Sequence, residues 1–443
     1  MRFNNNTLRS QPVVLSVFMS FRSLVLAGAL IAAASAPLAT AAESLSLDDA
    51  VRQALAHNRD LIAVGIGPEA ARGRVDQAIL KPNPALEAGV QSDLITGNTG
   101  ARKFDLGLAQ AIPLGNRLHE AQSVARVDIA LASAEFADRQ RRVVGEVTEA
   151  VVGLLALDRQ IALRGRLIDV SRRLVELSRA RAKVGEVSSV EVNAAALELA
   201  RLEPERATLL VERTSQLQRL KPLLGLSPDE PLEIADDLDK VLATFVSTAD
   251  GDKATWNRPD LRSAALAIDR VEAEQRLARA EVRGDLTVGA TYEYERGATG
   301  DADHLLGVKM SVPLPVRNKN QGRLRELRAE RTRAQRELDA RELAVASEVA
   351  VAQQRVQQFQ KILEGYRTSV LPLGETAERD LVAAYQQGQV PLFQVIQSQQ
   401  QRLALEAGAV EAGAAYARAL AELQTATGRN PQLVSGLAPE SRP

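Results

Sequence analysis

The stretch from residue 117 to residue 183 contains no proline across 67 residues, which as one α-helix would span about 100 Å. A second stretch, 320–386, has the same length and a single proline, Pro372. Apolar residues recur in both at alternating spacings of three and four, which is typical of a seam between supercoiled helices. The residues of these seams are Leu163, Leu167, Val170, Leu174 and Leu177 in the first, and Val345, Val349, Ala352, Val356, Phe359, Leu363, Tyr366 and Val370 in the second. The pattern predicts two long coiled-coil helices.

The chain also carries an internal repeat. Arg59-Asp60-Leu61 returns as Pro259-Asp260-Leu261, Ile112-Pro113-Leu114 as Val312-Pro313-Leu314, and Gly185 as Gly388. Ordered matches at offsets of 200 and then 203 indicate a tandem duplication, with chance matching in an Ala- and Leu-rich chain as the alternative. We predict repeats over 44–240 and 258–431, a linker at 241–257 and a C-terminal tail at 432–443. Each repeat is expected to run helix, strand, strand, long helix, turn and helix, ending with helices 189–225 and 391–427.

Four short segments alternate strictly between apolar and polar residues, near 84–94, 103–113, 285–295 and 304–313. This period predicts strands of a sheet with one apolar face, and each has the length that a tilted strand needs to cross a membrane. We expect the following side chains to face lipid: Phe104, Leu106, Leu108, Leu286, Val288, Tyr292, Val308 and Met310. Four strands cannot close on themselves, so several copies would have to pool them. The alternative is a small soluble β-layer packed on helices.

The N-terminus reads as an export signal. Arg22 precedes an apolar run over 24–36, and small residues follow up to Ala42, so residues 1–41 are predicted to be a cleaved signal peptide; an uncleaved anchor is the alternative. Met19 would also serve as a start. The chain has no cysteine and a net charge of −1, which argues against disulfides and against a nucleic-acid partner.

The sequence resembles the TolC-like outer-membrane efflux proteins, in the branch that serves heavy-metal resistance of the cobalt-zinc-cadmium type. The segments that carry the resemblance are Ser46-Leu47-Asp48-Asp49-Ala50, Asn83-Pro84, Gln110-Ala111-Ile112-Pro113-Leu114-Gly115-Asn116-Arg117, Arg258-Pro259-Asp260-Leu261, Val312-Pro313-Leu314-Pro315 and Arg317-Asn318-Lys319-Asn320-Gln321-Gly322.

The resemblance implies a mostly α fold with a small β part. It further implies a homotrimer with a shared twelve-stranded transmembrane β-barrel, four strands per chain, and a long α-helical coiled-coil barrel in the periplasm. The implied function is that of a passive outer-membrane channel for cobalt, zinc, cadmium or nickel cations. Its implied partners are outer-membrane lipid, a periplasmic membrane-fusion adaptor protein and a proton-driven inner-membrane pump of the RND type. Two alternatives stay open: a channel for drugs or other organic solutes, and a soluble periplasmic coiled-coil adaptor.

Two helix tips are the candidate functional segments. The resemblance implies that the tips contact the adaptor through Val184, Gly185, Glu186 and Val187 in the first tip and Gln387, Gly388, Gln389 and Val390 in the second. It also implies a periplasmic gate, in which Glu191 takes the place of a carboxylate that is latched to a tyrosine, here Tyr385. The latch arginine is replaced by Val390, and the constricting positions hold Gln394 and Gln397.

No cluster of metal ligands or catalytic residues emerges from the sequence. His57, His119, His304 and Met310 are scattered, without the spacing that a metal site requires. We therefore predict no cofactor and no catalytic residue, and expect each histidine to lie at a surface or an interface.

Overall fold

The computed structural model describes residues 44–92, 102–249, 258–296 and 301–428. The predicted signal peptide and the C-terminal tail lie outside these residues, as does the second half of the predicted linker. In chain order the elements are β1 (Ser44–Leu45), α1 (Leu47–His57), α2 (Arg59–Gly65), α3 (Gly67–Ala78), β2 (Ala85–Ser92), β3 (Arg102–Pro113), α4 (Arg117–Lys183), α5 (Ser189–Leu223), β4 (Glu233–Ile234), α6 (Leu238–Ala249), α7 (Pro259–Glu281), β5 (Asp285–Arg296), β6 (Ala302–Ser311), α8 (Gln321–Gly365), the π-helical turn η2 (Tyr366–Val370), α9 (Leu371–Gln386) and α10 (Leu392–Thr427).

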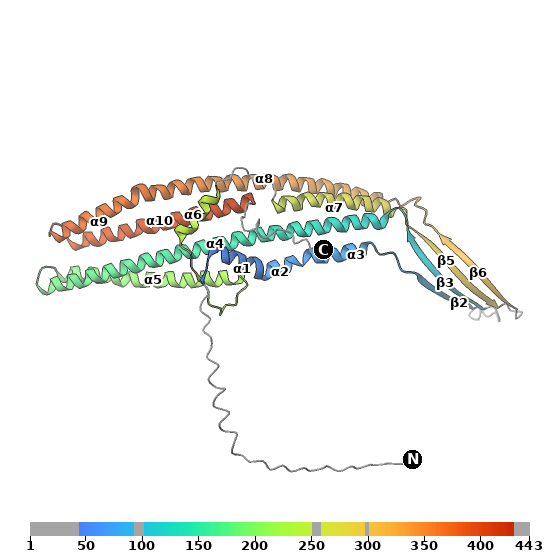
Figure 1. Ribbon diagram of the computed structural model, residues 1–443, viewed down its shortest axis with the longest axis horizontal. Helices are drawn as coiled ribbons and strands as arrows, with labels where there is room; N and C mark the ends of the chain where they lie inside the picture. Colours follow the sequence, from blue (N-terminus) through green and yellow to red (C-terminus); the bar gives the residue numbers. More distant parts are fainter. Residues whose placement is uncertain (1–43, 93–101, 250–257, 297–300, 429–443) are drawn as a thin grey trace, which may run out of the picture. The chain divides into compact units, whose positions relative to one another are not determined.

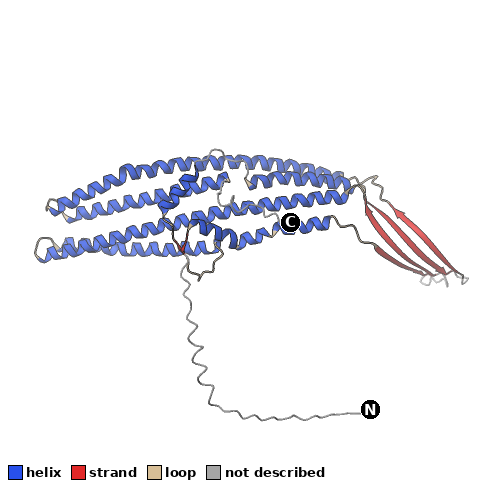
Figure 2. Ribbon diagram, in the orientation of Figure 1, coloured by secondary structure: helices blue, strands red, loops and turns tan. Residues whose placement is uncertain are grey.

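Two antiparallel helical hairpins make up most of the described chain (Figures 1 and 2). Helix α4 packs along α5, and the α8–η2–α9 helix packs along α10, which also contacts α4. Helix α7 lies against both α4 and α8, and α3 lies against α4. Within the described ranges, no helix combines the length and apolarity that a membrane span requires.

The seam of α4 differs from the prediction in its second half. Leu163 and Leu167 are buried as expected, but Val170 and Leu177 are exposed. The buried stripe continues instead through Ile168, Ser171, Val175 and Ser178. The hydroxyl of Ser178 donates to the carbonyl of Leu174 at 2.8 Å, so a polar side chain is accommodated inside this stripe.

The second long helix runs without a gap from Gln321 to Gln386, but a π-helical turn that was not predicted lies within it at Tyr366–Val370. Pro372 lies two residues after this turn; a proline has no amide hydrogen and its ring displaces the preceding turn, which a wider π-turn accommodates. The seam shifts at this point. Continuing the spacing from Val370 would bury positions 373, 377 and 380, yet these are exposed and the partly buried stripe runs one residue later, through 374, 378 and 381.

Strands pass into the long helices through the same backbone geometry in both halves. Asn116 and Asn320, each directly before its helix, adopt the left-handed conformation with φ of 61° and 54°, which asparagine tolerates better than most residues. The side-chain amide nitrogen of Asn320 donates a hydrogen bond to the carbonyl of Ala278 at 2.8 Å. Arg117 pairs with Asp285 at 3.1 Å, joining the start of α4 to the start of β5.

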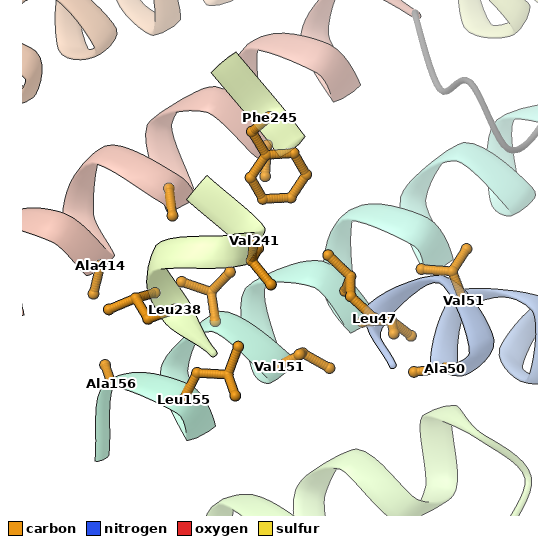
Figure 3. Close-up of a cluster of buried hydrophobic side chains, with 14 of the residues drawn as sticks. Leu47, Ala50, Val51, Val151, Leu155, Ala156, Leu238, Val241, Phe245 and Ala414 are labelled. Atoms are coloured by element: carbon orange, nitrogen blue, oxygen red, sulfur yellow. The ribbon is translucent and has the colours of Figure 1, made fainter. Parts of the chain in front are cut away.

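The largest core lies where α1, α4, α6 and α10 meet (Figure 3). The predicted linker is in part wrong here, because its first residues belong to α6. Val241, Leu242 and Phe245 follow helical spacing and are buried in this core. The linker prediction relied on the polar residues after 246 and overlooked that spacing.

The first repeat opens with three helices rather than the single expected helix. Asn58 ends α1 with an extended backbone and caps α2, its side-chain oxygen accepting from Leu61 N at 2.9 Å. Its amide nitrogen also donates to the carbonyl of Leu223 at the end of α5. Ile66 then separates α2 from α3, whose first turn contains Pro68.

A four-stranded antiparallel sheet has the order β2-β3-β5-β6. Rows of partners run straight across it, for example Ala88, Leu106, Tyr292 and Leu306. All four predicted strands are present, with bounds shifted by up to two residues among those described; residues 93 and 94 lie outside the described part. β1 and β4 form a separate parallel pair.

Candidate functional site

One face of the four-stranded sheet collects all eight side chains that were predicted to face lipid. The register aligns Leu106 with Tyr292, Leu108 with Val308 through Ala290, and Val288 with Met310. Leu306, Val308 and Met310 are 88%, 85% and 71% exposed in the single chain. Such a concentration of exposed apolar side chains marks a surface that another apolar medium covers.

The opposite face of the same sheet is polar. Its acidic side chains are Glu87, Asp105, Asp285, Glu293, Glu295 and Asp303, against two lysines, Lys103 and Lys309. Lys103 is paired with Glu293 at 2.7 Å, and Asp285 with Arg117. Negative charge is therefore in excess on this face.

The two helix tips share one geometry. Helix α4 ends at Lys183 and Gly185 follows with φ of 80°; α9 ends at Gln386 and Gly388 follows with φ of 73°. After each glycine an amide reaches back to the last helical turn: Glu186 N donates to Arg181 O at 3.0 Å, and Gln389 N to Ala384 O at 2.9 Å. This is the Schellman arrangement that glycine permits at a helix end.

The next helix of each tip starts in a different way. Ser188 caps α5 by accepting a hydrogen bond from Glu191 N at 3.3 Å. Pro391 precedes α10 without a side-chain cap. At the tips themselves, Val184 is 72% exposed and a Cβ on either glycine would meet no atom within 4 Å. At these positions both turns are therefore open to solvent in the single chain.

A small apolar cluster supports the tips from behind. It consists of Val175, Ala195, Tyr385, Leu392, Val395 and Ile396. Val390, which was predicted to contact the adaptor, is partly buried against this cluster. Its side chain therefore anchors the second turn more than it presents a surface.

The candidate gate residues lie in two places. Tyr385 is buried in the tip cluster, and its hydroxyl has no hydrogen-bond partner among the described residues, Glu191 included. The guanidinium of Arg181 lies 4.9 Å above the Tyr385 ring, a cation–π contact. Gln394 and Gln397 are exposed in the single chain and lie three residues apart on α10.

Sequence reasoning missed Arg181, which also lies 3.8 Å from Glu186. The resemblance implied a latch arginine only in the second tip, at the position of Val390. The position of Arg181 in the last turn of α4, where cations are favourable, was the signal that could have drawn attention to it.

A buried ion pair was also missed. Arg258 and Asp260 form two hydrogen bonds, at 3.0 and 2.8 Å, and Arg258 also pairs with Glu348 at 2.8 Å. Burial by itself would raise the pKa of the Asp260 carboxyl, but the hydrogen bonds and charge of Arg258 outweigh it and lower that pKa. The pair fixes the start of α7.

Among the described residues, no group of three or more His, Asp or Glu side chains is arranged to hold a metal ion. The ring of His57 lies within hydrogen-bond distance of the carbonyl of Gln53, Nδ1 to O at 3.3 Å. His304 shares a hydrogen bond with Tyr292, Nδ1 to Oη, at 2.6 Å on the apolar face of the sheet.

Comparisons with known proteins agree with this architecture. The chain is 24% identical to the cobalt-zinc-cadmium resistance protein CzcC of Cupriavidus metallidurans over 362 residues, which are 81% of this chain and 84% of that protein. Its fold matches CusC with a TM-score of 0.70 at 16% identity, covering 88% of this chain and 93% of CusC. It also matches the outer membrane protein VceC of Vibrio cholerae, with a TM-score of 0.66, 18% identity and coverage of 86% and 96%.

The family assignment follows from a match that spans most of the chain. The model of the outer membrane efflux protein family matches residues 50–226 and again residues 251–429. With the fold and the paired tips described above, this places the chain: it belongs to the outer membrane efflux protein family.

Proposed function

We propose that three copies of the chain form the outer-membrane channel of a tripartite export system that carries heavy-metal cations out of the cell. The observation that supports this proposal is the four-stranded sheet, which has one apolar face, one polar face and open edges. Within the described chain, β2 and β6 each pair with one neighbour, so both edges of the sheet are open. Open edges in lipid leave backbone groups without hydrogen bonds, at a cost of several kcal/mol each. Three copies joined edge to edge would give a closed sheet of twelve strands.

The absence of cysteine from the chain makes this arrangement testable. Ala88→Cys in β2 is combined in turn with a cysteine at one of six apolar-face positions in β6 and just after it, because closing a barrel staggers neighbouring strands by several residues and the register between copies has to be searched. These positions are Ala302, His304, Leu306, Val308, Met310 and Val312. Oxidation in isolated outer membranes should give a covalently linked trimer for one combination. Leu106→Cys, in the interior strand β3, replaces Ala88→Cys as the control and should give none. If every edge pair stays monomeric in membrane fractions, the proposal of a shared sheet is wrong.

Two observations favour cations as the transported solute. The similarity to CzcC, a cobalt-zinc-cadmium resistance protein, is one. The other is the acidic face of the sheet, which would line the channel once the apolar face is in lipid. A passage lined by negative charge concentrates cations and hinders anions.

The solute is best identified by deletion and complementation. A strain that lacks the chain should become sensitive to cobalt, zinc, cadmium or nickel salts, and the wild-type gene should restore growth. Sensitivity confined to drugs or organic solvents would favour the organic-solute alternative. Extraction of the processed chain without detergent would favour the soluble periplasmic adaptor instead.

The tips are proposed to contact the periplasmic adaptor, which connects the channel to a proton-driven pump in the inner membrane. Single cysteines at Val184 or Gln389 should cross-link to the adaptor in cells. Leu343→Cys is the matched control, because Leu343 is as exposed as Val184 but lies within α8, away from the tips. Equal adaptor cross-linking from Leu343→Cys would contradict a tip-specific contact. Glu191, Tyr385, Gln394 and Gln397 remain the proposed gate at this end.

A further inference from the structure

Two arginines lie side by side at the end of the sheet that is farthest from the helices. Arg102 begins β3 and Arg296 ends β5, and the register makes them direct cross-strand partners. Both side chains are exposed. Like charges at directly opposite positions repel each other and destabilise a sheet unless an anion lies between them.

The register places this arginine pair on the apolar face. Strand residues two apart share a face, so Arg102 is on the side of Phe104 and Leu106, and Arg296 on the side of Tyr294 and Tyr292. The acidic side chains near this end, such as Glu295 and Asp303, belong to the other face. Among the residues that the structure describes, no carboxylate forms an ion pair with either guanidinium, whereas Lys103 on the opposite face has Glu293.

A row of rings lies directly below the arginine pair. Phe104 and Tyr294 have ring centroids 6.3 Å apart, and those of Tyr294 and His304 are 5.2 Å apart. In the next row Tyr292 lies between Leu106 and Leu306, and its hydroxyl is hydrogen-bonded to His304. Tyrosines at the border of an apolar band mark the level where lipid tails give way to headgroups. The arginines are one row beyond that border.

We propose that Arg102 and Arg296 together bind the phosphate group of an outer-leaflet lipid. This rests on the proposed function, in which the apolar face is in lipid and the helices are on the periplasmic side. Guanidinium groups bind phosphate through paired, charge-assisted hydrogen bonds, and two of them can hold one phosphate from both sides. A bound phosphate would also cancel the repulsion between the two arginines, so binding and sheet stability are coupled at this rim.

The test uses the full-length protein in neutral detergent, with bound lipid counted by native mass spectrometry. The probe is a lipid A that carries two phosphates, compared with the same lipid stripped of phosphate. The wild type should retain the phosphorylated form at least about tenfold better than Arg102→Gln/Arg296→Gln does, since two charge-assisted contacts are lost. Arg102→Lys/Arg296→Lys keeps both charges and should recover part of the binding. Lys103→Gln/Lys309→Gln removes the same charge from the opposite face and should bind like the wild type.

Several outcomes would overturn the inference. Equal retention by the wild type and the Gln pair would show that the arginines do not hold lipid. Equal retention of the two lipid forms would show that the protein does not recognise the phosphate group. Binding of inorganic phosphate without any preference for the phosphorylated lipid would identify a site for free anions instead. A Gln pair that loses trimer stability without any dependence on lipid would point to a contact between copies.

Failure of the proposed function itself gives a different result. Fractionation of cells that express each variant reports whether the protein reaches the outer membrane at all. If the protein inserts normally but lipid retention does not change when the arginines are replaced, only this inference is contradicted. A chain that is absent from the outer membrane contradicts the proposed function and this inference together.

Discussion

Arg141 and Arg258 donate hydrogen bonds to consecutive carbonyls at the end of α10. Nη1 of Arg141 reaches the carbonyl of Thr425 at 3.0 Å, and Nη1 of Arg258 reaches that of Ala426 at 2.9 Å. The carbonyls of a last helical turn have no partners within the helix, and cations there are favourable. Arg141 belongs to α4 in the first half of the chain and Arg258 precedes α7 in the second. The end of α10 is thus fixed by both halves.

Loss of Arg258 should therefore destabilise the protein strongly. Arg258→Gln removes the cation that is hydrogen-bonded to the buried Asp260 and leaves Arg341, at 3.9 Å, as its other ion-pair partner. Removing one partner of a buried ion pair typically costs about 3–5 kcal/mol. The measurement is thermal unfolding of the detergent-solubilised protein. Arg336→Gln is the control, because its pair with Asp339 is exposed on both sides and should contribute less than about 1 kcal/mol. Equal unfolding temperatures for the two variants would contradict the role assigned to Arg258.

The Asp260 pair should also make stability depend on pH. Because the folded protein lowers the pKa of Asp260, the stabilisation is fully present above the usual carboxyl pKa of about 3.9 and is lost as the pH falls through the lower, folded-state value. Asp260→Asn should be less stable than the wild type at neutral pH, and the gap should narrow below about pH 4. Unfolding temperatures between pH 7 and pH 3 test this. A gap that stays constant would rule the linkage out.

Alanine at the tip glycines should strain the turns without any clash. Gly185→Ala and Gly388→Ala each force a side chain into the left-handed region, at a cost of roughly 1–2 kcal/mol. Gly73→Ala is the matched control, since it also meets open space but lies inside α3, where alanine should stabilise by about 0.5–1 kcal/mol. Hydrogen exchange of the tip amides should rise in the first two variants only. Unchanged exchange in both tips would mean that the turns adapt freely.

Tyr385 should matter through its ring rather than its hydroxyl. The hydroxyl is buried without a partner, so Tyr385→Phe should leave stability unchanged or slightly raise it. Tyr385→Ala empties part of the tip cluster and removes the contact with Arg181, which should cost about 3–5 kcal/mol. Thermal unfolding distinguishes the two. A large loss in Tyr385→Phe would reveal a hydrogen bond that forms in another state of the protein.

Periodic features could be predicted from the sequence, and local exceptions to them could not. Alternation over 285–295 predicts both the strand and its apolar face, because a period of two leaves one register that buries that face. The long helices follow from the absence of proline and from their spacing. The position at which the offset between the two repeats changes from 200 could not be predicted. The left-handed asparagines, Asn116 and Asn320, are 204 residues apart, so the extra residues lie before the helices, in the junction after β6.

Side-chain pairing across the two halves was beyond prediction from one sequence. Nothing in the spacing indicates that Arg181 covers Tyr385 or that Arg141 reaches Thr425, because these pairs form only once separate helices pack. The π-turn was missed for a related reason. Pro372 indicates a local irregularity, but the spacing of apolar residues is regular up to Val370. Only the burial of the residues after Val370 shows that the buried stripe moves by one residue.

That shift by one residue has a mechanical consequence. Helix α4 runs unbroken from the sheet to its tip, so any twist of the first tip must be distributed over the entire length of the helix. The second hairpin contains the π-turn Tyr366–Val370, in which backbone hydrogen bonds can change between the four-residue and the five-residue spacing. We expect it to act as a torsional joint, so that the two tips of one chain, alike in shape, differ in how readily they rotate.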